Sequence, residues 1–379
     1  MPARPRRARR RRAARRWRGR ERAGQRTRRG RPHHRNRNLT RIVASAPGKL
    51  VLLGEYAVLE GAPALVLAVN RRVRVTLGAV DGDAWEIVSP TLGLVARLRL
   101  QAGIAKWLDA EPPELAWVAT LLVQFPHADA LPPHSIELDS DAFHLDRAGA
   151  RAKLGLGSSA ALTVALLGAL HARANLPSPT LDECIAAHRA IQQGQGSGID
   201  IAASFAGGLS RFQLEGNTPR ATPAILPDGL HWRCVYSGRP ASTRALLATV
   251  GAWRERDPAG FRRQMRELAT ISSRGIDALT ANDAAAFLSS LHDYALALAR
   301  FGEAAGADIA SGEHRALSAL ATECGCVYKS CGAGGGDIGV TFAVEDERLR
   351  EFSARATQAG FPVIGLEADP QGLAIASTA

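Results

Sequence analysis

The chain has 379 residues, of which 46% are hydrophobic, so it is long enough to bury one large core or two ordinary ones. It contains no apolar run of the ~18 residues that a membrane-spanning helix needs and no signal-peptide pattern, which predicts a cytoplasmic protein without a membrane partner. The net charge of +12 is unevenly divided, because residues 1–40 hold 18 arginines and one acidic residue whereas the remainder holds 30 basic and 35 acidic residues.

Residues 1–40 form an arginine-rich tail with too few apolar residues to fold by itself. Three interpretations fit this composition: a basic arm for nucleic acid or a membrane surface, a serine-poor transit peptide, or an extension from a misassigned start codon. We favour the third because domain signals begin only at Ile42, although Met265 is the only other methionine and a later start needs a different codon. Residues 41–379 carry more acidic than basic residues, which argues against nucleic-acid binding by this part of the chain.

The first half of residues 41–379 is predicted to form a sheet with helices packed against it. Strands are expected over residues 41–80, with a glycine-containing interruption, and over 84–89, 134–141 and 207–215. Helices are expected over residues 103–124, 160–174 and 180–193. Thr180 is the expected N-cap of the last helix, with Glu183 at the spacing of a capping box. The Pro-, Thr- and Asn-containing residues 216–228 indicate a linker.

The second half predicts a strand, several helices and a final mixed segment. The strand is expected over residues 231–238, and the helices over 242–254, 258–280, 282–301 and 306–323. A strand, a helix and two more strands follow, which favours an α+β half with helices on one face of an antiparallel sheet. We therefore expect domains at residues 41–220 and 221–379. The five cysteines include "CGC" at 324–326 without a second pair, which indicates reduced thiols rather than a zinc site.

The stretch "KLGLGSSAALTVALLGAL", residues 153–170, carries the first chemical signal. Glycines let a backbone approach a ligand closely, and the free N–H groups and dipole of a helix N-terminus favour an anion. The loop is not a Walker A sequence, and a tight turn with Ser158 as N-cap is the plain alternative. The expected phosphate-binding residues are Gly155, Leu156, Gly157, Ser158, Ser159 and Ala160.

Two further glycine-punctuated segments accompany it, "APGKLVLLGEYAVLEG" at 46–61 and "KSCGAGGGDIGV" at 329–340. Together with "GLGSSAA", this set resembles the GHMP kinase superfamily over nearly all of residues 42–375. The resemblance implies an α+β GHMP kinase fold, with an N-terminal half like ribosomal protein S5 domain 2 and a ferredoxin-like C-terminal half. It also implies ATP and Mg²⁺ as cofactors.

The flanks of these motifs resemble those of the phosphomevalonate kinases. Lys153 precedes the glycine loop where mevalonate kinases usually have a proline-led segment, and "GQGSGIDIAASFAGGLSRF" and "SGRPAST" are also similar. The resemblance implies that the small-molecule substrates are ATP and phosphomevalonate. Because that acceptor is already a phosphate with a second pKa near ~6, a base matters less than cations that hold two phosphates together. Lys49 is the expected cation. Asp200 matches the catalytic aspartate of the superfamily, and the resemblance implies that it orients the acceptor or accepts from it and fixes Lys49, with N-capping of a helix from Ile201 as its structural alternative.

The remaining expectations concern the metal and the substrate. Ser159, or Ser158, is the implied magnesium ligand, and the glutamate that mevalonate kinases place eleven residues before the aspartate is Arg189 here. We expect His188 to be structural, and Arg71, Arg72 and Arg74 to form a mainly solvated strand face. The expected substrate-binding residues are Tyr56, Lys153, Ser197, Gly198, Ser242, Thr243, Gly334, Gly335 and Asp337, of which Ser242 and Thr243 have helix capping as an equal alternative.

Three alternatives stay open. The chain could be a mevalonate kinase, which needs Asp200 as a true base, or a non-catalytic binding or sensor protein with the same fold. Retention of Lys49, Ser159 and Asp200 together argues against the sensor. A nucleic-acid-binding protein is supported only by the tail, and would show salt-sensitive affinity that disappears without residues 1–40. The oligomeric state is expected to be a monomer or a homodimer.

Overall fold

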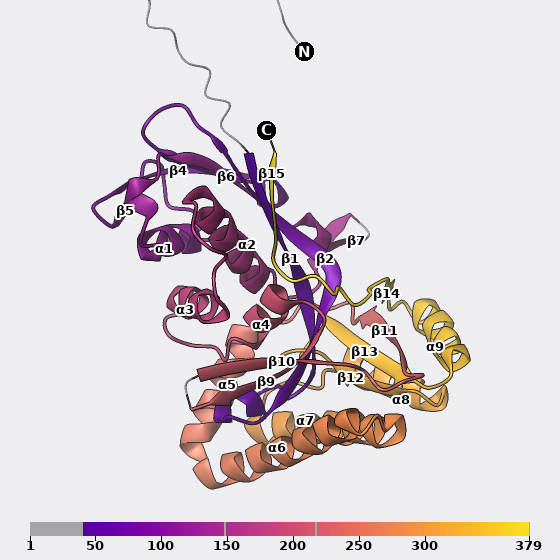
Figure 1. The fold of residues 1–379 in the computed structure, drawn as a ribbon. Helices are drawn as coiled ribbons and strands as arrows, with labels where there is room; N and C mark the ends of the chain where they lie inside the picture. The colour runs from indigo at the N-terminus through magenta and orange to yellow at the C-terminus, as the bar shows by residue number, and fades with distance from the viewer. Residues whose placement is uncertain (1–40, 148, 217, 379) are drawn as a thin grey trace, which may run out of the picture. The chain divides into compact units, whose positions relative to one another are not determined.

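Two long antiparallel strands form the centre of the first sheet in the computed structural model, which describes residues 41–147, 149–216 and 218–378 (Figure 1). The predicted tail of residues 1–40 lies outside these described residues. The strands of the sheet are β1 (Arg41–Leu53), β2 (Ala64–Ala79), β3 (Trp85–Ser89), β4 (Leu94–Gln101), β5 (Ile104–Trp107), β6 (His134–Asp139), β9 (Leu209–Glu215), β10 (Thr218–Ala224) and β15 (Ala374–Thr378). The order is β10-β9-β2-β6-β3-β4-β5, with β1 beside β2 and β15 beside β1. A separate hairpin pairs β7 (His144–Arg147) with β8 (Ala150–Lys153).

Four helices accompany this sheet, and α2 and α4 pack against β1 and β2 (Figure 1). They are α1 (Ala116–Gln124), α2 (Ser158–Arg173), α3 (Leu181–Ile191) and α4 (Ile199–Ala206). Helix α2 has no charged residue before Arg173 and is buried along most of its length, as expected for a helix that is apolar on nearly all sides. The predicted capping box of α3 is present, because Thr180 accepts from the Glu183 N–H and Glu183 accepts from the Thr180 N–H.

The second sheet has the order β12-β13-β11-β14. Its elements are β11 (His231–Tyr236), β12 (Val327–Ser330), β13 (Ile338–Ala343) and β14 (Val363–Ile364), with helices α5 (Thr243–Arg256), α6 (Pro258–Thr280), α7 (Ala284–Ala305), α8 (Gly312–Glu323) and α9 (Asp346–Gln358). Val235 shares a buried cluster with α8 and α9, whereas its neighbour Cys234 belongs to the main core. Phe287 of α7 packs against Phe342 of β13. Successive strand residues face opposite sides, so helices cover both faces, and the expectation of one covered face is wrong.

Two other expected elements differ from the structure. The helix predicted over residues 103–124 is helical only from Ala116, because residues 104–107 pair with β4 as an edge strand and Pro112 and Pro113 lie before the helix. The linker predicted over residues 216–228 contains β10, which pairs with β9. Pro219 and Pro223 are tolerated there because β10 is an edge strand.

The C-terminal strand β15 returns to the first sheet, where Ala376 pairs with Val43 of β1 (Figure 1). The boundary expected between residues 220 and 221 falls within β10, and the described residues from Arg41 onward form one compact unit. The division at 220 therefore stays a prediction. Within the described residues, the helices are too short or too polar to cross a membrane.

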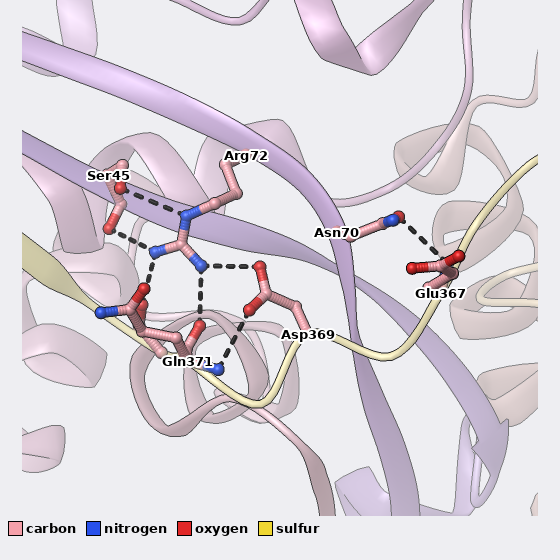
Figure 2. A network of polar contacts seen from close by, with 7 residues as sticks. Ser45, Asn70, Arg72, Glu367, Asp369 and Gln371 are labelled. Atoms are coloured by element: carbon pink, nitrogen blue, oxygen red, sulfur yellow. Dashed lines mark hydrogen bonds and ion pairs between the residues drawn. The ribbon is translucent and has the colours of Figure 1, made fainter.

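Arg72 holds the C-terminal segment against the first sheet (Figure 2). Its guanidinium donates to the Asp369 carboxylate (2.7 Å) and to the backbone carbonyls of Gln371 (2.7 Å) and Gly372 (2.6 Å). It also donates to the hydroxyl (3.2 Å) and the carbonyl oxygen (3.0 Å) of Ser45. The anion that Arg72 contacts is therefore the Asp369 carboxylate of the same chain.

Arg72→Ala should lower the free energy of unfolding by about 3 kcal/mol, because it leaves the Asp369 carboxylate largely buried without its cation. Urea denaturation measures this change. Arg74→Ala is the matched control, since Arg74 lies on the same strand with its side chain exposed, and it should change stability by less than about 0.5 kcal/mol. Equal losses for the two variants would contradict the role of Arg72.

Candidate active site

A cavity of about 870 Å³ brings together segments that lie far apart in the sequence. It is bordered by β1, by the first residues of α2, by the end of α3 with its following loop, by α4, by α5 and by the loop at Gly332. Seven of the predicted site residues line it, namely Lys49, Tyr56, Ser159, Ser197, Gly198, Asp200 and Thr243. All three glycine-punctuated motifs therefore contribute to the walls of one cavity.

Lys49 is the buried cation of this cavity. Its side chain is 7% exposed, and its Nζ lies 3.5 Å from Oδ1 of Asp200. The Lys49 N–H donates to the carbonyl of Leu156 (3.0 Å), which ties β1 to the glycine loop before α2. A Cβ at Gly157 would lie 3.0 Å from Cε of Lys49, so only glycine allows this approach at its φ of 80°. The predicted pairing of Lys49 with Asp200 is present.

The predicted phosphate loop divides into buried and accessible residues. Leu156, Ser158 and Ala160 are buried in the packing around α2, whereas Ser159 is exposed to the cavity. Gly157 occupies the N-cap position, so the alternative that Ser158 caps the helix is wrong. Ser159 stands one residue into α2, at a helix N-terminus that favours an anion.

Asp200 lies in the first turn of α4, which begins at Ile199 rather than at Ile201. Gly198 is the N-cap residue with a φ of 90°, and the Ile199 N–H donates to Oγ of the buried Ser197 (3.3 Å). Asp200 is therefore not the N-cap of α4. Its carboxylate is 36% exposed and lines the cavity beside Lys49.

Asp337 of the third motif packs against the glycine loop before α2, outside the cavity lining. A Cβ at Gly155 would lie 2.4 Å from Oδ2 of Asp337, so this aspartate packs directly on the glycine loop. Oδ1 of Asp337 accepts from the Ala241 N–H (3.2 Å), while burial raises the pKa of the Asp337 carboxyl and the charges of Lys49 and Lys153 oppose that rise. Asp337 and the exposed Lys153 are outside the cavity lining.

Gly334 and Gly335 are also buried away from the cavity lining. The Gly335 N–H donates to the carbonyl of Ile309 (2.7 Å), and a Cβ at Gly334 would lie 2.6 Å from the same oxygen. Gly334 and Gly335 thus let the loop of the third motif pack closely against the segment before α8. Gly332 and Ala333, which were not among the expected site residues, line the cavity instead.

Tyr56 connects the first motif to the third. Its hydroxyl donates to the Ala333 carbonyl (2.6 Å), and its backbone has a φ of 60°, which is uncommon for a residue other than glycine. Burial raises the pKa of the Tyr56 hydroxyl, so it stays a hydrogen-bond donor. In the structure, Tyr56 shapes the cavity wall and orders the third glycine loop.

A buried ion pair that sequence reasoning missed lies next to Tyr56. Glu55 lines the cavity, and its Oε1 is bonded to Nζ of Lys329, which also donates to the Ser330 carbonyl (2.6 Å). Burial raises the pKa of the Glu55 carboxyl, and the charges of Lys329 and Lys49 offset part of the rise. Oε2 of Glu55 is buried and has no hydrogen-bond partner among the described residues. Glu55 and Lys329 stand inside the first and third motifs, and pairing across such a distance leaves no local sequence signal.

Lys329→Met should lower the free energy of unfolding by about 3–5 kcal/mol, because the Glu55 carboxylate loses its buried partner. The deficit should be smaller at pH 5 than at pH 8, since a raised pKa lets Glu55 take up a proton that replaces the lost cation. Denaturant titrations at the two pH values measure both effects.

The double variant Glu55→Gln/Lys329→Met should recover most of this stability, because it buries no charge. Lys106→Met is the control, as Lys106 is exposed on the edge strand β5. A Lys329→Met variant as stable as Lys106→Met would contradict the proposed importance of the pair.

His188, which the sequence predicts to be structural, is buried and lies in the cavity wall. Its Nε2 is 3.3 Å from Oγ of Ser159 and 3.4 Å from Nε2 of Gln192. Burial lowers the pKa of His188, while the charge of Asp200 opposes this shift. The imidazole can therefore accept a hydrogen bond from the Ser159 hydroxyl, which leaves the serine lone pairs facing the cavity.

Helix α5 forms another part of the wall. Ser242 is its N-cap and accepts from the Ala245 N–H (3.3 Å), so the capping alternative is confirmed for Ser242. Thr243 is the first helical residue and lines the cavity, as do Arg244 and Leu247. Sequence reasoning did not select Arg244, because a single arginine in a helix usually lies on a solvated face.

Residues 118–208, which include the glycine loop and Asp200, match the family GHMP kinases N terminal domain. The chain is 29% identical over 358 residues to a phosphomevalonate kinase of a Streptomyces species, covering 82% of this chain and 92% of the relative. It is 34% identical over 214 residues to the mevalonate kinase of Methanothermobacter thermautotrophicus, covering 54% of this chain and 61% of the relative. The solved structure of Streptococcus pneumoniae phosphomevalonate kinase in complex with phosphomevalonate and AMPPNP matches with a TM-score of 0.69 at 19% identity, covering 86% of this chain and 99% of that one. The fold expected from the motifs is thus confirmed, and residues 118–208 carry the N-terminal domain of the family that the motifs resemble.

Proposed function

Because the chain carries a GHMP kinase N-terminal domain and has the GHMP kinase fold, we propose that it transfers the γ-phosphoryl group of ATP to (R)-5-phosphomevalonate, giving 5-diphosphomevalonate and ADP. The observation that carries this proposal is the convergence of Lys49, Ser159 and Asp200 on one cavity. The extensive similarity to a phosphomevalonate kinase supports the choice of acceptor. We also propose that the enzyme acts in the cytoplasm on the route to isoprenoid precursors.

The nucleotide is assigned to the glycine loop and the start of α2. The free N–H groups of the first helical turn can hold phosphate oxygens, and Gly155 and Gly157 remove side chains that would collide with Asp337 and Lys49. Ser159 faces the cavity from the same turn. The triphosphate would thus end beside Lys49, where its terminal phosphoryl group meets the acceptor.

The acceptor side of the cavity needs charge neutralisation more than proton removal. An oxygen of the acceptor phosphate forms the new P–O bond as the bond between the γ-phosphorus and the β–γ bridging oxygen breaks, and ADP leaves with that electron pair. At neutral pH the acceptor phosphate has mostly lost its second proton already. We therefore assign Lys49 to holding the two phosphates together and Asp200 to orienting Lys49 and the acceptor.

Magnesium fits this arrangement through oxygen donors. Ser159 and Asp200 offer a hydroxyl and a carboxylate to the cavity, while no three His, Cys, Asp or Glu side chains within residues 41–147, 149–216 and 218–378 form a metal-binding cluster. Arg189 donates to the carbonyls of Gly196 (3.2 Å) and Ser197 (3.4 Å), so it orders a loop and supplies no ligand. This set suits a magnesium ion held largely by nucleotide phosphates and water. When bound, the ion would neutralise charge on the β- and γ-phosphates.

A coupled ADP-release assay of the full-length protein tests the proposal, with ATP and magnesium and with 5-phosphomevalonate, mevalonate or homoserine as acceptor. Turnover on 5-phosphomevalonate alone is the expected result. Turnover on mevalonate instead would favour the second candidate, a mevalonate kinase, which the similarity to the Methanothermobacter thermautotrophicus enzyme supports. A folded protein that binds ATP and turns over none of the three would contradict the proposed function.

A further inference from the structure

The charged side chains that line the cavity are not all neutralised by partners. The four charged residues in its lining are Lys49, Glu55, Asp200 and Arg244. Lys49 pairs with Asp200, and Glu55 pairs with Lys329 behind the wall. Arg244 makes no ion pair and no side-chain hydrogen bond with any residue that the structure describes. The cavity therefore presents one cation whose charge and donors are free for a ligand.

Arg244 comes from the first turn of α5, on the helix face that borders the cavity. Thr243, Arg244, Leu247 and Ala248 line it together, as residues one helical turn apart do. This face combines a hydroxyl group, a guanidinium and apolar side chains. It suits a small ligand that has an anionic end and an aliphatic body.

A phosphorylated acceptor requires more positive charge in the cavity than Lys49 alone provides. Transfer brings the acceptor phosphate, a dianion, against the terminal phosphate of the nucleotide. Lys49 shares its charge with Asp200, at 3.5 Å. A second cation that contacts the acceptor phosphate would reduce the repulsion, and a guanidinium offers two parallel donors that match phosphate oxygens.

We propose that Arg244 binds the phosphate of the acceptor and so makes the enzyme select phosphomevalonate over mevalonate. This inference rests on the proposed function. It assigns a specificity residue on α5, separate from the Lys49 and Asp200 pair on β1 and α4. The carboxylate of the substrate is the competing anion for Arg244, and mevalonate carries that carboxylate without the phosphate, so the two compounds separate the possibilities.

Calorimetric titration of the full-length protein with each compound, with and without AMPPNP and magnesium, tests the inference. Arg244→Gln should raise the Kd for 5-phosphomevalonate about tenfold, the lower end expected for a charge-assisted hydrogen bond at an accessible site. The Kd for mevalonate should change less than about twofold. Arg244→Lys keeps the positive charge but loses the two parallel donors of the guanidinium. Its Kd for 5-phosphomevalonate should lie between those of Arg244→Gln and the wild type.

Arg256→Gln is the matched control, because Arg256 is exposed at the far end of the same helix and outside the cavity lining. It should bind both compounds as the wild type does. Raising the salt concentration should weaken phosphomevalonate binding more in the wild type than in Arg244→Gln, since the lost contact is ionic.

Two results would overturn the inference while the proposed function stands: an unchanged Kd for 5-phosphomevalonate in Arg244→Gln, or an equal loss of affinity for both compounds. The second result would place the guanidinium on the carboxylate. A wild-type protein that binds 5-phosphomevalonate under neither condition would overturn the proposed function together with the inference. The wild-type titration therefore distinguishes the two failures.

Discussion

Lys49→Ala should lower turnover on 5-phosphomevalonate by about 10²–10³-fold, the loss typical of removing one preorganised charge contact to a transition state. Lys49 is the buried cation that the first motif places at the junction of all three motifs, 3.5 Å from Asp200. Without Lys49, less of the negative charge on the terminal phosphate of ATP and on the acceptor phosphate is neutralised during transfer. We therefore expect kcat to fall more than the affinity for ATP. Steady-state kinetics of the purified variant measure the effect.

The fold should survive this substitution. Asp200 is 36% exposed, so its carboxylate can be hydrated when Lys49 is removed, unlike the nearly inaccessible Glu55. Circular dichroism and a nucleotide titration with AMPPNP should therefore resemble those of the wild type. Near-normal turnover from a folded Lys49→Ala protein would remove Lys49 from the mechanism.

Asp200→Asn should lower turnover about 10–10²-fold on 5-phosphomevalonate, because an asparagine keeps the shape but loses the charge that fixes Lys49. This loss is smaller than the 10²–10⁴-fold typical of removing a general base. The acceptor phosphate is mostly a dianion at neutral pH, so proton removal contributes little to the barrier.

The pH profile decides between the two roles of Asp200. If it orients the acceptor, the wild type and Asp200→Asn should share the same acidic limb, set near pH ~6 by the second ionisation of the acceptor phosphate. If it is a base, the acidic limb of the wild type reports the aspartate, and Asp200→Asn should displace it clearly. A displaced limb would restore the general-base role and, with it, the mevalonate kinase alternative.

The positions of the motifs could be predicted from the sequence because they depend on local chemistry. Gly157 and Gly198 sit where the backbone must have a positive φ just before a helix, and glycine marks such positions in any sequence. The capping box at Thr180 likewise depends on residues three apart. The glycine loop was therefore identified from local chemistry, whereas Lys49 and Asp200 were identified through the resemblance of their motifs to those of the GHMP kinases.

Other contacts in the site could not be predicted, because they join residues distant in the chain. Glu55 and its partner Lys329 are 274 residues apart, and the predicted Tyr56 bonds to Ala333, which is 277 residues away. His188 differs from an ordinary helical histidine only by the Ser159 hydroxyl that the packing of α2 and α3 brings near it. Conversely, Gly334, Gly335 and Asp337 carry a strong motif, yet they lie behind the cavity wall rather than in its lining.

The sequence by itself determined the α+β class and the glycine residues that turn the chain at each motif, since glycines, caps and apolar periodicity act within a few residues, and the resemblance of these motifs indicated the fold. Only the tertiary structure decided which side chains share the cavity, that β15 returns to β1, and that Arg72 reaches Asp369. The physical reason is that burial and pairing of charges depend on distance through space, which becomes defined only when both sheets and their helices have packed.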